Sequence, residues 1–383
     1  MKSLKVSDLV VGGRYSKPIY LDQESIFINA NITITESDVQ KLKKFGLTEV
    51  FTDGVLLGKD ESIVDEPPSN PSQNKLYQLY KQTVKFKTDF QRTYNDVFLF
   101  VQNMYRKTSE DKSIEVAEIR STAELILDHV KSNPNFLFFL LNHFEEGYYL
   151  YNQTVKSTFY AVSIGTILEY SRPKLLDLCM AGLVADIGMA KIPSTVSEKN
   201  GTLNEEEYKV IKKHPLIGYQ ILTKNIKLKG SLANIALQHH ENYDGSGYPQ
   251  RLKKSDVDEA SYIYSIADNF SSMTSNRPWR RKFLPYDALK TMISVVMNKF
   301  DLKILRLFLS RISMYPIGSY VELSDGSIGQ VLDSNQTQML RPSLFIVRAH
   351  DGKIPKKNQF INLVDDTQIY ITKAVDFVPF DED

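Results

Sequence analysis

The chain has 383 residues and a formal net charge of +1, with 42% hydrophobic and 24% charged residues. Its length exceeds that of one typical domain, and the near-neutral charge gives no reason to expect a nucleic-acid polymer as a partner. No apolar run is long enough to cross a membrane, and the first residues lack the apolar core of a signal peptide. The single cysteine, Cys179, excludes an internal disulfide. We therefore expect a soluble, cytoplasmic protein of two or three domains.

Residues 1–57 predict a small α+β domain. Short β-rich runs separated by turn residues stand at 10–13, 18–21 and 26–28. An amphipathic helix with an N-cap signal follows from Thr35 and ends near Gly46. No residue type here is typical of catalysis, so we expect a sensory, docking or dimerising role. Residues 58–75 contain three prolines with serines and acidic residues, which predicts a linker.

The middle of the chain predicts helices, with a connector at 76–147 and a helical bundle at 148–312. Apolar residues recur at three- and four-residue steps over 76–103, which indicates one long helix. This helix either forms a coiled-coil homodimer or packs within its own chain, and both alternatives are open. A capping-box pattern at 202–205 is expected to open a helix that carries His214. Other helices are predicted at about 114–130, 150–170, 174–187, 229–240, 258–273, 284–299 and 301–312.

Residues 313–383 predict a small all-β domain because the hydrophobic period changes to two. Strands are predicted at 319–323, 328–332, 343–347 and 368–371. A turn with Asp325 and Gly326 joins the first two strands and is a strong hairpin signal. The predicted fold class is therefore mainly α, a helical bundle with a small α+β N-terminal domain and a small all-β C-terminal domain.

Candidate metal ligands recur at intervals of about 25–28 residues on consecutive predicted helices. They are Asp186, His214, His239, His240 and Asp268. Mixed imidazole and carboxylate ligation suits Fe, Mn or Zn, and pairs of such ions hydrolyse phosphate esters. Each of the five could instead be an isolated core or surface polar residue, but their arrangement favours a shared site. A glycine-rich turn at 244–249 follows the paired histidines and lets the backbone pass close to a ligand.

The segment 149–285 resembles an HD-GYP domain, the metal-dependent branch of the HD superfamily that hydrolyses cyclic di-GMP. The matching stretches are 186–188, 192–193, 214–218, 239–241, 244–249, 267–268 and 277–280. The two-part signature within 239–249 is the most specific of these. The resemblance implies an HD-type helical fold and a divalent metal as cofactor.

The resemblance also implies roles for individual residues. One complete metal position is matched by Asp186, which is also the catalytic candidate, together with His214, His239 and His240. Asp268 belongs to a second metal position. Contacts to cyclic di-GMP are implied for Tyr248, Arg277 and Arg280, and arginine suits both phosphate and guanine edges. Alternatively, Arg280 lies in a solvated charge run and Tyr248 only shapes the turn or binds a partner protein.

The chain departs from the family pattern at four positions. Ala185 replaces the histidine of the His-Asp pair, Gln153 an upstream histidine, Tyr149 an acidic ligand, and Met189 a lysine that meets substrate phosphate. Alanine and methionine do not bind a hard cation, and glutamine is a weak neutral ligand. We therefore expect at most one well-held ion, for which Fe or Mn fits better than Zn.

Three functions remain open at this point. The leading hypothesis is a degenerate HD-GYP protein, of low or no phosphodiesterase activity, that binds cyclic di-GMP, a partner protein through the turn at 244–249, or both. The second is an active metal-dependent cyclic di-GMP phosphodiesterase, which is mononuclear if it holds one ion. The third is an interaction protein whose ligand site is vestigial.

Overall fold

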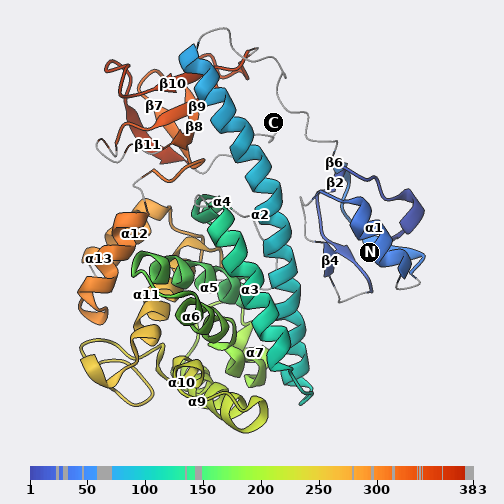
Figure 1. The fold of residues 1–383 in the computed structure, drawn as a ribbon, viewed down its shortest axis with the longest axis vertical. Helices are drawn as coiled ribbons and strands as arrows, with labels where there is room; N and C mark the ends of the chain where they lie inside the picture. Colours follow the sequence, from blue (N-terminus) through green and yellow to red (C-terminus); the bar gives the residue numbers. More distant parts are fainter. Residues whose placement is uncertain are drawn as a thin grey trace.

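Three parts of the chain are arranged along one long helix, α2 (Pro71–Ser109), in the computed structural model (Figure 1). The structure describes residues 1–22, 26–28, 33–44, 47–57, 71–133, 136–142, 149–277, 280–294, 297–312, 315–333, 335, 338, 340–355 and 357–375. Most of the predicted linker therefore lies outside the described residues. Its last residues are helical, because α2 begins at Pro71, where a proline is tolerated in the first turn. Within the described residues, no helix combines the length and apolar character needed to span a membrane.

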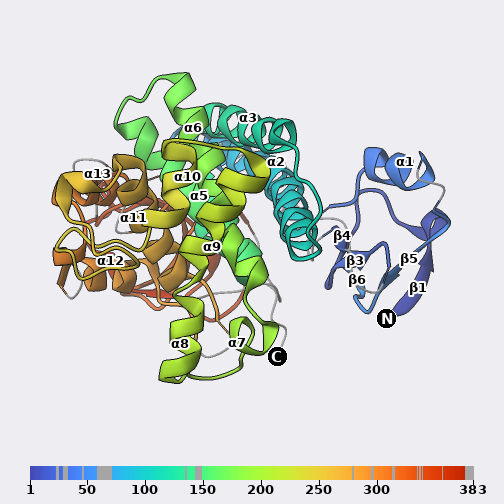
Figure 2. The ribbon, with the colours of Figure 1, turned by 90° about the horizontal axis from the view of Figure 1, so that it is seen from below.

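The N-terminal part is a small α+β domain beside α2, on the opposite side from the helical bundle (Figure 2). Its elements are β1 (Lys2–Lys5), η1 (Val6–Asp8), β2 (Arg14–Tyr15), β3 (Ile19–Tyr20), β4 (Ile26–Ile28), α1 (Glu36–Lys44), β5 (Glu49–Thr52) and β6 (Leu56–Leu57). The main sheet has the order β1-β5-β3-β4, and β2 pairs with β6. The predicted strands at 18–21 and 26–28 are confirmed. The strand predicted at 10–13 is wrong, since the chain turns there with Gly12 at a φ of 85°.

The helical bundle follows α2. Its helices are α3 (Val116–Ser132), α4 (Phe136–Asn142), α5 (Tyr149–Ile167), α6 (Arg172–Val184), α7 (Ser194–Ser197), α8 (Glu205–Ile211), α9 (His214–Gln220), α10 (Ser231–Gln238), α11 (Glu259–Thr274), α12 (Pro285–Ser294) and α13 (Leu302–Arg311). Short 3₁₀ turns are η2 (Ile187–Lys191), η4 (Lys254–Asp256) and η5 (Met297–Lys299), and η3 (Ile221–Ile226) is a π-helical turn. The capping box is found two residues later than predicted, between Asn204 and Glu207, and His214 opens its own helix.

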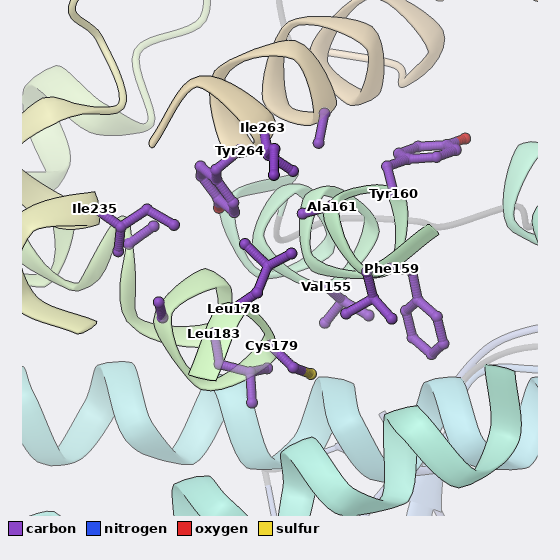
Figure 3. Close-up of a cluster of buried hydrophobic side chains, with 14 of the residues drawn as sticks. Val155, Phe159, Tyr160, Ala161, Leu178, Cys179, Leu183, Ile235, Ile263 and Tyr264 are labelled. Carbon is purple, nitrogen blue, oxygen red and sulfur yellow. The ribbon is translucent and has the colours of Figure 1, made fainter. Parts of the chain in front are cut away.

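Helix α5 forms the centre of the bundle and is buried on almost every side. In Figure 3 its residues Val155, Phe159 and Ala161 lie among apolar side chains from α6, α10 and α11. The only cysteine, Cys179, is buried in this core. The helix also buries polar side chains, of which Asn152, Gln153 and Ser157 are hydrogen-bonded inside the bundle, as buried polar groups require.

Helix α2 packs against the helical bundle of its own chain from Phe90 onwards. Its side chains Tyr94, Val97 and Val101 have no exposed surface, and the Tyr94 hydroxyl donates to Asn152 Oδ1 on α5 at 3.1 Å. This packing supports the intramolecular alternative for the long helix. A homodimer through α2 remains a prediction.

The C-terminal domain is a five-stranded antiparallel sheet beside the N-terminal end of α2 (Figure 1). Its strands are β7 (Tyr320–Leu323), β8 (Ile328–Asp333), β9 (Ser343–Arg348), β10 (Phe360–Asn362) and β11 (Ile371–Val375), in the order β10-β9-β8-β7-β11. The hairpin between β7 and β8 is confirmed, with Gly326 at a φ of 85° in its turn. The fourth predicted strand begins later, at Ile371. The Tyr80 ring of α2 packs on Phe345, with ring centroids 4.6 Å apart, so the helix and the sheet share a small aromatic core.

Candidate metal centre

Two glycines bring the first pair of candidate ligands together. Asp186 lies two residues after the end of α6, and His214 is the first residue of α9. A Cβ on Gly188 would lie 2.1 Å from the His214 carbonyl oxygen, and one on Gly218 would lie 3.3 Å from the Gly188 nitrogen. Any larger residue at position 188 would push the backbone of α9 away. The close approach therefore places the carboxylate of Asp186 beside the imidazole of His214.

Four of the five predicted ligands face one another. Asp186 Oδ1 is 3.3 Å from His214 Nε2 and 3.4 Å from His239 Nε2, and these two nitrogens are 3.4 Å apart. With His240 included, one ligand atom from each residue lies within 4.8 Å of the others. Ligands bonded to one ion at about 2.1 Å stand roughly 3.0–3.4 Å apart. The donor set and its spacing therefore fit a single divalent ion.

The backbone fixes the orientation of two histidines. His214 Nδ1 donates to the Ile211 carbonyl at 2.8 Å, and His239 Nδ1 donates to the Ile235 carbonyl at 2.9 Å. A carbonyl oxygen only accepts, so each Nδ1 carries the hydrogen and each Nε2 presents a lone pair to the shared point. Hydrogen bonds of this kind orient metal-binding histidines and select their tautomer.

The charges in the cluster also suit a cation. Burial alone would raise the pKa of Asp186, but His239 and His214 hold that pKa well below its usual range. Burial, with His239 and His214 nearby, holds the pKa of His240 well below its usual range. The carboxylate is thus ionised and His240 is neutral, which are the forms that bind metals. For His239, the neighbouring Asp186 outweighs burial and raises the pKa.

Asp268 lies apart from this group, in a hydrogen-bonded network of its own. Gln153 Nε2 donates to the Asp268 backbone carbonyl at 2.9 Å and to its Oδ1 at 2.5 Å, and the Ser157 hydroxyl donates to the same Oδ1 at 3.2 Å. Gln153 Oε1 accepts from Arg277 at 3.2 Å and from Ser271 at 3.4 Å. Burial and the nearby carboxylate of the first cluster raise the pKa of Asp268. The one carboxylate at this position is held by two hydrogen-bond donors, and the neighbouring side chain of Gln153 is a neutral amide.

Two tyrosines complete the surroundings of Asp186. Its Oδ2 accepts from the Tyr264 hydroxyl at 3.3 Å, and its backbone carbonyl accepts from the Tyr105 hydroxyl at 3.1 Å. Ala185 is fully buried beside it and offers no ligand atom. Neither tyrosine could be recognised as a site residue from the sequence, since a buried tyrosine in a periodic helix resembles any other core residue.

The glycine-rich turn is held by Glu241, whose side chain has no exposed surface. Its carboxylate accepts from the backbone nitrogens of Gln250, Arg251 and Leu252 at 2.6, 3.1 and 3.0 Å. A Cβ on Gly247 would lie 2.3 Å from the backbone of the preceding turn, so only glycine fits there. Glu241 therefore shapes the turn, and it is not among the four clustered ligands.

The three residues predicted to contact the nucleotide, Tyr248, Arg277 and Arg280, lie in different surroundings. Tyr248 stacks on His240, with centroids 4.8 Å apart and planes at 24°. The guanidinium carbon of Arg277 lies 5.1 Å from the centroid of the Tyr149 ring, and the same group donates a hydrogen bond to the side chain of Gln153. Arg280 donates to backbone carbonyls at the end of α11, including that of Ser272 at 2.7 Å. Tyr248 and Arg277 thus adjoin the cluster and the Asp268 network, respectively, while Arg280 caps a helix.

The four clustered residues lie within a segment that matches a known domain family. Residues 145–304 match the model of the HD domain family, and residues 320–380 match a KOW domain associated with the HD domain. A cyclic di-GMP phosphodiesterase of Pseudomonas aeruginosa is 26% identical over 69% of this chain and 63% of its own length, so the chain spans less than two thirds of that relative. Cyclic di-GMP phosphodiesterase PdeB of Borreliella burgdorferi is 24% identical over 92% of this chain and 90% of its own length.

A solved structure shares the fold. The HDG"Y"P protein Bd1817 of Bdellovibrio bacteriovorus has a TM-score of 0.53 at 16% identity, covering 80% of this chain and 97% of that one. At this identity the likeness concerns the fold alone. Residues 145–304 are therefore an HD domain, in a chain homologous to bacterial cyclic di-GMP phosphodiesterases.

Proposed function

We propose that this chain is a cyclic di-GMP signalling protein that binds the dinucleotide at its single metal centre and hydrolyses it slowly or not at all. The names of its relatives support the ligand. The observation that carries the proposal is the contrast between the two positions. At the first metal position, the ligand atoms of Asp186, His214 and His239 lie 3.3–3.4 Å apart. At the second position, Gln153 and Asp268 are hydrogen-bonded to each other.

The protein's own groups prepare the centre in defined ways. A divalent ion held by Asp186, His214, His239 and His240 would polarise a phosphoryl oxygen and lower the pKa of a bound water. Tyr264 engages the second oxygen of Asp186, so this carboxylate has one oxygen turned to the histidines and the other to a hydroxyl. A two-metal site places a second cation on the phosphate, whereas the described residues of this chain form one cluster of metal ligands and no second one. Low turnover follows from that missing charge.

The nucleotide is expected to lie across the two positions, with Tyr248 on one side and Arg277 on the other. The Tyr248 ring offers a flat face for a base. The guanidinium of Arg277 lies over the Tyr149 ring and would supply charge-assisted hydrogen bonds to phosphate or guanine. The exposed turn residues Asp244 and Ser246 remain candidates for a partner protein.

A combined hydrolysis and binding assay tests the proposal. Full-length protein is loaded anaerobically with Fe or Mn, incubated with cyclic di-GMP, and analysed for the linear dinucleotide, while calorimetry measures binding. We expect binding with slow or absent turnover, and the loss of bound metal in His239→Ala. Turnover of about 1 s⁻¹ or faster would contradict the proposal. The absence of binding would leave an interaction protein with a vestigial site.

An active mononuclear phosphodiesterase is the second candidate. The spacing of the three ligand atoms and the preset tautomers of His214 and His239 favour it, because one well-held ion still activates water. The same assay separates the two candidates through the rate.

A further inference from the structure

We propose that Lys212 is a phosphate-binding residue, one that holds a phosphodiester of the bound cyclic dinucleotide beside the metal centre. This inference rests on the proposed function and adds a residue to it. Lys212 is the C-cap residue that follows α8, two residues before the candidate ligand His214, and its side chain is half-buried.

An aromatic cradle holds the ammonium group of Lys212. Its Nζ is 4.5 Å from the centroid of the Tyr208 ring and 5.2 Å from that of Tyr248. The Tyr248 ring stacks in turn on His240. Lys212, Tyr248 and His240 are therefore in successive contact, and the cation belongs to the wall of the metal centre.

The cradle leaves the positive charge available. Ring faces attract a cation without neutralising it, whereas a carboxylate would cancel the charge. Neighbouring lysines are neutralised in this way, since Lys199 pairs with Glu207 at 2.6 Å and Lys209 pairs with Glu206 at 2.7 Å. Among the residues that the structure describes, no acidic group pairs with Lys212.

The position of Lys212 complements that of Arg277. Cyclic di-GMP carries two phosphodiesters, one of which would meet the metal centre. Arg277 lies on the side of Gln153, and Lys212 lies on the side of the glycine-rich turn. A cation on this second side would match the other negative charge of the same ligand, and a lysine acts on phosphate as a point charge with rotatable donors.

A purely structural role gives a different expectation. A lysine at the end of α8 also interacts favourably with the carbonyl end of that helix. Its removal would then lower the melting temperature and leave ligand affinity unchanged. The test therefore reads both quantities on the same variants.

The experiment measures cyclic di-GMP affinity by calorimetry on full-length Lys212→Met, Lys212→Arg and Lys224→Met. Lys224→Met is the matched control, because it removes the same charge from an exposed position in η3, 12 residues further along the chain. We expect roughly tenfold weaker binding in Lys212→Met, a smaller loss in Lys212→Arg, and no change in Lys224→Met. Metal content should be equal in all of them. Added salt should weaken binding less in Lys212→Met than in the unaltered protein.

The outcomes separate this proposal from the proposed function. If the unaltered protein binds and Lys212→Met binds equally well, the role of Lys212 is refuted while the proposed function stands. If Lys224→Met weakens binding as much as Lys212→Met, the effect is one of net charge and the specific role is likewise refuted. If the unaltered protein does not bind cyclic di-GMP, both fail.

Discussion

Replacement of Glu241 by glutamine tests how the glycine-rich turn is held. The carboxylate accepts three backbone hydrogens, two at Oε1 from Gln250 and Arg251 and one at Oε2 from Leu252. An amide keeps one acceptor oxygen, so the first two bonds survive in weaker, uncharged form. The third donor, from Leu252, would face an NH₂ group. One charge-assisted bond is lost and a part-buried donor is left unsatisfied, which costs about 2–3 kcal/mol of folding stability.

Urea denaturation followed by tryptophan fluorescence measures this loss. Trp279 is the chain's single tryptophan and falls within the HD domain match at 145–304, so its signal reports on that domain. Glu206→Gln is the matched control, because Glu206 is an exposed carboxylate whose partner is a surface lysine, and such pairs contribute little. A loss in Glu241→Gln no larger than in this control would refute the structural role of the buried carboxylate.

Further predictions concern the metal centre and the bundle. Gln153→His should raise the metal content above one ion per chain, because an imidazole would replace the amide that is now hydrogen-bonded to Asp268. Elemental analysis measures this content, and an unchanged value would show that the position lacks more than one ligand. Tyr105→Phe removes the donor to the backbone of Asp186 and should weaken metal affinity about tenfold in a chelator competition. Burial lowers the pKa of His129, so the unfolded chain binds its proton more readily and folding stability should fall as the pH drops below about 6.5. An NMR titration that places this pKa above 6.5 would contradict the last prediction.

The helical bundle could be predicted well from sequence because its apolar residues keep a helical period over long segments. The β10 strand was missed, since three residues at 360–362 are too short to show an alternation. The strand predicted at 10–13 failed for a conformational reason, because Gly12 has a positive φ that turns the chain. Short elements depend on turn geometry and on the partners they meet in the fold, and neither is written in a local pattern.

For the site, spacing and residue type identified the four residues that the structure brings together. The sequence also indicated that Gln153 is a poor ligand. It could not show that this amide would bind Asp268, because that contact depends on how α5 packs against α11. The role of Tyr264 was hidden for the same reason, since only the folded chain turns its hydroxyl towards Asp186.

The metal content of the purified full-length protein tests the central claim most directly. The protein is reconstituted anaerobically with excess Fe or Mn, freed of loosely bound ions, and measured by elemental analysis, with His239→Ala as the control. One well-held ion per chain, lost in the control, is the result that we predict from the cluster of Asp186, His214, His239 and His240. Two tightly bound ions per chain would contradict the single-metal account.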